Sequence, residues 1–200
     1  MRGFPGRLVL ATTNRGKLAE VAAVLGAQGV EVVGADALVA GWCTVEEGAT
    51  FAENARAKAL DLARRTGVPA LGDDSGLEVA ALGGRPGVRS ARYAGEGASD
   101  AANVVRLLHE LRDVSEARRT AVFRCALALA WPDGLVVEAE GRCEGTITHA
   151  PRGCGGFGYD PVFADPVTGL TFAELPAEVK NAHSHRRRAL DLLLARFGRQ

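Results

Sequence analysis

The sequence predicts an α/β protein with a mixed β-sheet, and three observations support this. Residues 8–11 form a short apolar run that leads through a polar turn into a stretch with helical periodicity. Residues 120–145 alternate with period two on both sides of a Pro-Asp-Gly turn, which is typical of a hairpin. A content of 47% hydrophobic and 24% charged residues is that of a globular chain. Strand–turn–helix units give parallel strand pairs and hairpins give antiparallel ones, so we expect both in one sheet.

The N-terminal unit is expected to run from strand to helix. The polar residues Thr12–Asn14 follow the strand and can cap a helix N-terminus. Apolar side chains then recur at helical spacing from Leu18 to Leu25, and Gly26 ends the helix.

A capping box predicts the second helix. In the segment from Thr50 to Glu53, the hydroxyl and the carboxylate each accept a hydrogen bond from the other residue's backbone N–H. We expect this helix to continue to about Arg65, with Gly67 just beyond it.

Three further elements complete the expected fold. A third helix is capped at Ser99 or Asp100, and the hairpin turns at residues 132–134. The chain closes on an amphipathic helix that begins after Ser184, with Leu190 and Phe197 on its apolar face.

Length and charge narrow the classes of function. Two hundred residues suit one compact domain, which we expect to cover residues 1–200. Lys and Arg number 24, as do Asp and Glu, so we expect no nucleic-acid partner, because no general positive field would hold one. Apolar runs are too short to span a bilayer and the N-terminus is unlike a signal peptide, so no membrane partner and a cytoplasmic location are expected. The four cysteines lack C-x-x-C spacing and are expected to be reduced thiols.

Two segments carry cations where an anion could bind. Residues 12–17 lie between a strand and a helix, where N–H groups and the helix dipole favour a phosphate. They are not a P-loop, because Ala11 and Leu18 stand where that motif needs Gly and Ser or Thr. Lys58 falls on the apolar stripe of the second helix, so its ammonium points with the apolar side chains and is expected to have an anionic partner. The alternatives are a solvated Lys17 and a Lys58 that reaches the rim of the core.

Adjacent acids suggest a metal site. Asp73 and Asp74 follow a short apolar run and are flanked by glycines. Two neighbouring carboxylates repel each other, and a divalent cation bound between them and another acid removes this repulsion. Glu46 and Glu47 are candidates for that acid. The alternative is an Asx-type turn without a ligand.

The glycine loop at 153–158 matches G-x-G-x-x-G, but its context does not fit a dinucleotide fold. Pro161 follows where a helix should begin. The loop would instead let a flat ligand approach the backbone and would present Phe157 and Tyr159 for stacking, unless it is an ordinary loop with buried aromatic residues. Lys180 and the basic residues at 185–188 form another cluster of donors suited to an anion, or else a solvated helix face.

Taken together, these segments resemble the inosine/xanthosine triphosphate pyrophosphatases, which hydrolyse nonstandard purine nucleoside triphosphates. The resemblance runs from Leu8 to about Phe197. It is carried by five segments in order: LATTNRGK, GATFAENARAKA, GDDSGLEVAALGGRPGVRSARYAGE, GGFGYDPVF and KNAHSHR.

The resemblance implies a fold and an activity. The fold would have an elongated central mixed sheet with helices that form two lobes around a cleft, and the protein would be a homodimer. The activity would be Mg²⁺-dependent hydrolysis of ITP, dITP or XTP to the monophosphate and pyrophosphate. Two alternatives stay open: a Maf-like pyrophosphatase that acts on pyrimidine or modified nucleotides, and a nucleotide-binding module without catalysis.

The resemblance also implies site residues. Asp74 would be the catalytic acid and a magnesium ligand, with Glu47 as the second metal ligand and Asp73 beside it. Contacts to the triphosphate, the base and the rest of the substrate would come from Thr12, Thr13, Asn14, Arg15, Gly16, Lys17, Lys58, Ser75, Phe157, Gly158, Tyr159, Asp160, Lys180, His185 and Arg186.

Overall fold

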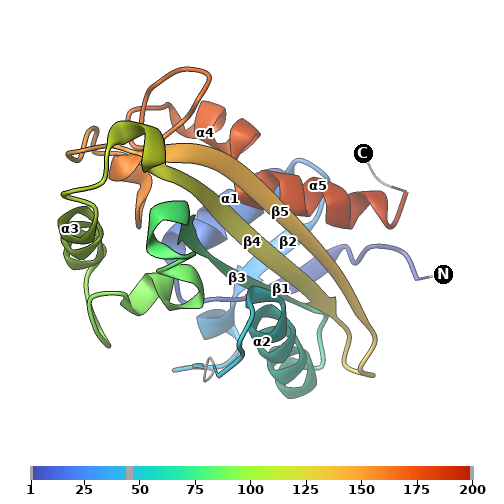
Figure 1. Ribbon diagram of the computed structural model, residues 1–200. Coiled ribbons are helices and arrows are strands. Elements are labelled where there is room, and N and C mark those ends of the chain that lie inside the picture. Colours follow the sequence, from blue (N-terminus) through green and yellow to red (C-terminus); the bar gives the residue numbers. More distant parts are fainter. Residues whose placement is uncertain (1, 44–46, 199–200) are drawn as a thin grey trace. The chain divides into compact units, whose positions relative to one another are not determined.

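A computed structural model describes residues 2–43 and 47–198 (Figure 1). Helices and strands alternate in its first half, and the second half contains a long hairpin followed by two further helices. The strands are β1 (Arg7–Ala11), β2 (Glu31–Gly34), β3 (Ala70–Val79), β4 (Thr120–Ala130), β5 (Val136–Ile147) and β6 (Phe163–Ala164). The helices are α1 (Arg15–Gly26), α2 (Phe51–Thr66), α3 (Asp100–Glu110), α4 (Ala177–His183) and α5 (His185–Ala195).

The strands form one mixed sheet in the order β2-β1-β3-β4-β5-β6. Strand β1 pairs in parallel with both β2 and β3, whereas β5 and β6 pair antiparallel. The predicted α/β class with a mixed sheet is therefore confirmed.

The chain divides into two compact units. Unit 1 takes its described residues from 2–74, 125–141 and 185–198, and unit 2 consists of residues 75–124 and 142–184. Strands β3, β4 and β5 each contribute residues to both units. A single domain over residues 1–200 stays a prediction.

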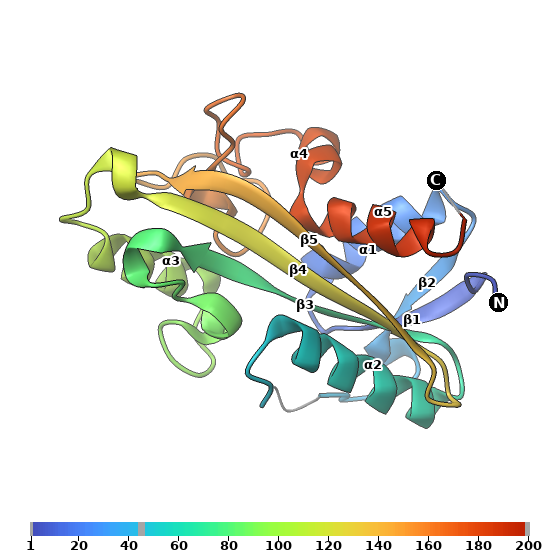
Figure 2. The same cartoon turned by 45° about the vertical axis from the view of Figure 1, so that its right-hand side comes forward.

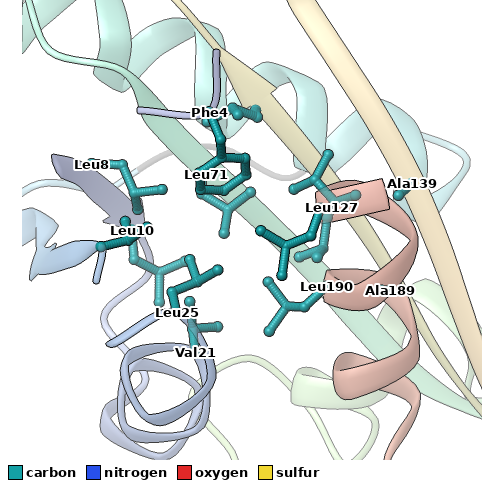
Figure 3. Close-up of a cluster of buried hydrophobic side chains, with 14 of the residues drawn as sticks. Phe4, Leu8, Leu10, Val21, Leu25, Leu71, Leu127, Ala139, Ala189 and Leu190 are labelled. Atoms are coloured by element: carbon teal, nitrogen blue, oxygen red, sulfur yellow. The ribbon is translucent and has the colours of Figure 1, made fainter. Parts of the chain in front are cut away.

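Unit 1 is built on a core between strands and two helices. Leu8 and Leu10 of β1 meet Val21 and Leu25 of α1 and Leu190 of α5 (Figure 3). In Figure 2, α1 and α5 lie together on one side of the unit 1 strands and α2 lies on the other. The strands of this unit are thus covered on both faces, which explains why β1 is apolar on both sides.

Unit 2 has a separate core with several aromatic residues. The rings of Phe123 and Phe163 lie 4.4 Å apart between centroids, and those of Phe163 and Phe172 lie 4.9 Å apart. Val104 and Leu107 of α3 belong to the same cluster. Each unit therefore buries its own apolar surface.

Most local signals in the sequence are confirmed. Thr50 and Glu53 form the predicted capping box, and Gly67 ends α2 in the left-handed region with φ +68°. Ser99 caps α3, and α5 begins directly after Ser184. Helix α4 was not expected. Among the described residues, no helix combines the length and the hydropathy that a membrane span needs.

Candidate active site

The two adjacent acids of β3 point to opposite faces of the strand. Asp73 is paired with residues of α1 and α5, whereas Asp74 is paired with residues of α2. The expectation that the pair follows the end of a strand, and the alternative that it forms an Asx-type turn, are both wrong, because β3 runs without a break from Ala70 to Val79. Successive side chains of a strand alternate between faces, so the two carboxylates diverge.

Asp74 is held by two polar side chains of α2. The Lys58 ammonium donates to Oδ1 at 2.6 Å, and the Asn54 amide donates to Oδ2 at 3.1 Å. All three side chains are buried. Gly72 makes this approach possible, because a Cβ there would lie 1.9 Å from the carbonyl oxygen of Ala55 in α2. The anionic partner that Lys58 was expected to need is therefore the Asp74 carboxylate.

The segment before α2 is tied to the same group. The backbone N–H of Gly48 donates to Oδ1 of Asn54 at 2.8 Å, so the residue next to Glu47 is fixed by the amide that also holds Asp74. Glu47 itself is exposed, and Glu46 lies outside the described residues. Among the residues that are described, no group of three or more His, Cys, Asp or Glu side chains is placed to hold a metal ion.

Asp73 lies in a buried network of charges. Lys17 contacts Oδ1 at 2.8 Å, Arg186 donates to Oδ2 at 2.6 Å, and the Cys125 thiol lies 3.6 Å from the same oxygen. Arg186 also donates to the buried Glu20 of α1. Burial alone would raise the pKa of Asp73, but the charges of Arg186 and Lys17 outweigh it and hold that pKa well below its ordinary value.

The same network affects the thiol beside it. Burial and the Asp73 carboxylate raise the pKa of Cys125 well above its ordinary value. Cys125 is therefore a neutral thiol, and it forms no disulfide in the structure, nor do the cysteines at 43, 143 and 154.

The start of α1 has the predicted cap. Oδ1 of Asn14 accepts from the backbone N–H of Lys17 at 3.0 Å, and the Asn14 N–H in turn donates to the Thr12 hydroxyl at 3.1 Å. The N–H groups of Arg15 and Gly16 occupy the first two positions of the helix, where an α-helix offers no internal acceptor. Thr13 is exposed in the same turn, so residues 12–17 present backbone donors at the positive end of a helix dipole.

Arg186 and His185 open helix α5 and are buried within unit 1. Gly141 lets this helix end approach β5 closely, because a Cβ there would lie 2.1 Å from the His185 carbonyl oxygen. The resemblance implied that both side chains contact the base. The structure places the Arg186 guanidinium on Asp73 and Glu20, and a contact with the base stays a prediction.

In unit 2, the predicted residues at 157–160 follow one another in a glycine-rich segment, and Lys180 of α4 contacts this segment. Oδ2 of Asp160 accepts from the Lys180 ammonium at 2.5 Å and from the Phe157 N–H at 2.8 Å. The same ammonium lies 4.5 Å from the centroid of the Phe157 ring, which is a cation–π distance. Gly156 has φ +71°, and a Cβ there would lie 2.0 Å from Oδ2 of Asp160, so only glycine fits.

Two contacts within unit 2 hold the rest of this loop. The Gly158 N–H donates to Asp100 of α3 at 2.7 Å, and the Tyr159 hydroxyl donates to the Ser90 carbonyl at 2.8 Å. Burial raises the pKa of Tyr159, so its hydroxyl stays protonated and keeps donating. Ser75 is half-buried in β3 of the same unit.

Comparison with known proteins places this arrangement in a family. The model of the Ham1 family matches residues 8–196, which include every predicted site residue. The chain belongs to the Ham1 family. The resemblance seen in the sequence is thereby confirmed.

Curated relatives of this Ham1 family chain are close to it in length as well as in sequence. A dITP/XTP pyrophosphatase of Geobacter sulfurreducens is 52% identical over 194 residues, which are 97% of this chain and 98% of that protein. A dITP/XTP pyrophosphatase of Streptomyces avermitilis is 52% identical over 185 residues, which are 92% of each.

Solved structures agree with this membership. The HAM1 protein from Coxiella burnetii has a TM-score of 0.85 at 41% identity, and the match covers 96% of this chain and 98% of that one. A nucleoside-triphosphatase / dITP/XTP pyrophosphatase from Mycobacterium abscessus has a TM-score of 0.74 at 44% identity, with 94% and 97% coverage.

Sequence reasoning missed several residues of the candidate site. Asn54 lies one helical turn before Lys58, on the same face of α2, and that spacing was a usable signal. Glu20 likewise lies one turn after Lys17 in α1. Asp100 was recognised only as a possible helix cap, and nothing in its neighbourhood indicates the contact with Gly158.

The Lys58–Asp74 pair leads to a testable stability effect. We expect Lys58→Met to lower the free energy of unfolding, because it leaves a buried carboxylate without its cation. In the double variant with Asp74→Asn this penalty disappears, so the two changes should couple by about 0.5–3 kcal/mol. Urea unfolding of the four proteins measures the coupling, and strictly additive losses would contradict the pairing.

Proposed function

We propose that this chain hydrolyses nonstandard purine nucleoside triphosphates, namely ITP, dITP and XTP, to the monophosphate and pyrophosphate. The observation that carries the proposal is the buried Asp74 carboxylate, set against the Lys58 ammonium at 2.6 Å in a chain of the Ham1 family. Relatives named dITP/XTP pyrophosphatase, about half identical over nearly the whole chain, support the same activity.

The triphosphate would be bound by unit 1. Lys17, Lys58 and the helix N-terminus at residues 12–17 supply cations and backbone donors. Charge-assisted hydrogen bonds of this kind are stronger than those between neutral groups. A few of them can therefore bind a triphosphate with its about four negative charges, even though the chain as a whole has no net charge. We propose contacts from Thr12, Thr13, Asn14, Arg15, Gly16, Lys17 and Lys58.

Asp74 would act on the attacking water. The water oxygen forms a bond to the α-phosphorus while its proton passes to the Asp74 carboxylate. The bond from the α-phosphorus to the bridging oxygen breaks, and pyrophosphate leaves with that electron pair. The Lys58 ammonium and the N–H groups of α1 would balance the negative charge that grows on the phosphate oxygens.

The donor set fits a magnesium ion. Mg²⁺ prefers oxygen ligands and is usually held through one or two carboxylates together with substrate phosphates. Asp74 and Glu47 supply such carboxylates, and the Asn54 contact with Gly48 connects the segments that carry them. When bound, the ion would polarise the phosphate and lower the pKa of water. We propose Mg²⁺ as the metal and Asp74 and Glu47 as its protein ligands.

We propose that the base is recognised by Phe157, Gly158, Tyr159, Asp160, Lys180, His185 and Arg186, with Ser75 as a further contact. A keto oxygen at position 6 accepts hydrogen bonds from cationic side chains. The 6-amino group of ATP is itself a donor, so it would face these donating side chains without forming hydrogen bonds. A site of this kind can lower kcat/KM for the wrong nucleotide by several orders of magnitude.

A homodimer and a cytoplasmic location stay predictions. Sedimentation of the purified chain tests the first, and fractionation of cells tests the second.

A substrate panel tests the proposed function. The purified chain with Mg²⁺ should release pyrophosphate from ITP and XTP much faster than from ATP or UTP, whereas GTP, which also has a 6-keto oxygen, should be a weaker substrate than ITP. Preference for a pyrimidine triphosphate would favour Maf-like chemistry. Binding of ITP without turnover would favour a nucleotide-binding module, and either result would contradict the proposal.

A further inference from the structure

Asn54 joins two parts of the candidate site that the sequence treats separately. It lies in the first turns of α2, and only 2% of its surface is exposed. Its Oδ1 accepts from the Gly48 N–H at 2.8 Å, and its amide nitrogen donates to Oδ2 of Asp74 at 3.1 Å. One side chain thus binds both the segment that follows Glu47 and the carboxylate of the proposed catalytic acid.

The chemistry of the two partners fixes how the Asn54 amide is turned. A backbone N–H can only donate and an ionised carboxylate can only accept, so the amide oxygen must face Gly48 and the nitrogen must face Asp74. The opposite orientation would put two donors together on one side and two acceptors on the other. The amide therefore has one satisfied orientation.

The position of Gly48 adds a steric reason for the same arrangement. A Cβ at residue 48 would lie 2.6 Å from Oδ1 of Asn54 and 2.9 Å from Cβ of Glu53. The backbone can approach the amide only because residue 48 has no side chain. The contact between Gly48 and α2 thus depends on the residue types at both positions 48 and 54.

We propose that Asn54 is a positioning residue for the reaction: it fixes the orientation of the Asp74 carboxylate and ties the segment of Glu47 to it. Lys58 holds one oxygen of Asp74 and Asn54 holds the other, so the carboxylate cannot rotate between them. Because Asn54 is neutral, it orients the acid without neutralising its charge. This inference rests on the proposed function, in which Asp74 receives the proton.

Asn103 supplies a matched control in unit 2. It is also 2% exposed, its Oδ1 accepts from the Ala94 N–H at 2.7 Å, and its amide donates to the Ala91 carbonyl at 3.1 Å. Both asparagines thus bridge a backbone N–H and an oxygen from within a helix, but Asn103 contacts none of the proposed site residues through these bonds. Replacing each by alanine removes one hydrogen bond from a backbone N–H and one to an oxygen.

The experiment compares Asn54→Ala, Asn103→Ala and the parent chain with ITP as substrate. Loss of a group that orients a catalytic or metal-binding side chain typically costs about 10–100-fold, so Asn54→Ala should lower kcat by that factor with KM changed by less than about threefold. Its melting temperature should also respond to Mg²⁺ only at a higher concentration than that of the parent chain. Asn103→Ala should lower the melting temperature by about as much as Asn54→Ala does, but it should keep a kcat within about twofold of the parent.

A second variant separates the two contacts of Asn54. Asn54→Asp has nearly the same shape and still accepts from Gly48, but it no longer donates an amide N–H to Asp74. We expect it to lose kcat at least as strongly as Asn54→Ala. A kcat near that of the parent would show that Asn54 serves the loop alone and would overturn the proposal.

The outcomes distinguish the two levels of the argument. If the parent chain does not hydrolyse ITP, the proposed function fails before any variant is compared. If the parent is active and Asn54→Ala keeps its kcat, or if Asn103→Ala loses as much, the positioning role fails while the function stands.

Discussion

Asp74→Asn is expected to lower kcat for ITP by about 10²–10⁴-fold, because an amide neither takes a proton from water nor binds a cation as a carboxylate does. The substitution keeps the shape of the side chain and its oxygen can still accept from Lys58, but its amide nitrogen then faces the Asn54 amide that donates to Oδ2 in the parent chain. The fold should therefore survive with a modest fall in melting temperature. Steady-state release of pyrophosphate measures the effect.

Circular dichroism and thermal melting are the controls for this variant. A folded Asp74→Asn with nearly normal kcat would remove Asp74 from the reaction. In contrast, Glu138→Gln changes a half-exposed carboxylate of unit 1 that pairs with Arg56 at 3.7 Å, and it should leave kcat unchanged.

Arg186→Met is expected to destabilise the chain by about 3–5 kcal/mol. The variant leaves Asp73 and Glu20 buried without the guanidinium that both contact, and a buried charge that loses its partner is costly. Urea unfolding measures the loss. Arg187→Met is the matched control, since Arg187 forms a surface pair with Asp191 on the same helix and should cost less than about 1 kcal/mol.

The pH dependence of stability gives a second readout of the same network. Asp73 has a depressed pKa in the folded chain, so it contributes stability that is fully present above its unfolded pKa of about 3.9 and is lost as the pH falls below that value. In Arg186→Met this acid-side loss should be smaller, because the main cause of the depression is gone. An unchanged acid limb would show that Arg186 does not set the pKa of Asp73.

The same variant decides whether Arg186 also reads the base. If it does, Arg186→Met narrows the ratio of kcat/KM for ITP to that for ATP, in addition to lowering stability. If the ratio is unchanged, the residue serves the Asp73 network alone and the role that the resemblance implied is wrong.

Local sequence signals predicted the elements well because their causes are local. The capping box of α2, the glycine that ends this helix and the turn of the hairpin each depend on residues a few positions apart. Helix α4 was not predicted from the sequence because it is only seven residues long and lacks a side-chain cap.

Long-range contacts explain what the sequence could not show. Arg186 meets Asp73 across 113 positions, and no local pattern reports such a pairing. Gly72 suggested the end of a strand, but it lies within β3, where a Cβ would meet the backbone of α2. Gly141 lies within β5 and admits the start of α5 in the same way. Once β3 is read as one strand through Gly72, the opposite directions of Asp73 and Asp74 follow from its alternation.

Identification of the products tests the central claim most directly. The parent chain with ITP and Mg²⁺ should yield inosine monophosphate and pyrophosphate in equal amounts, and Asp74→Asn should yield neither at a comparable rate. Formation of inosine diphosphate and phosphate would place the attack at another phosphorus, and this result would contradict the account.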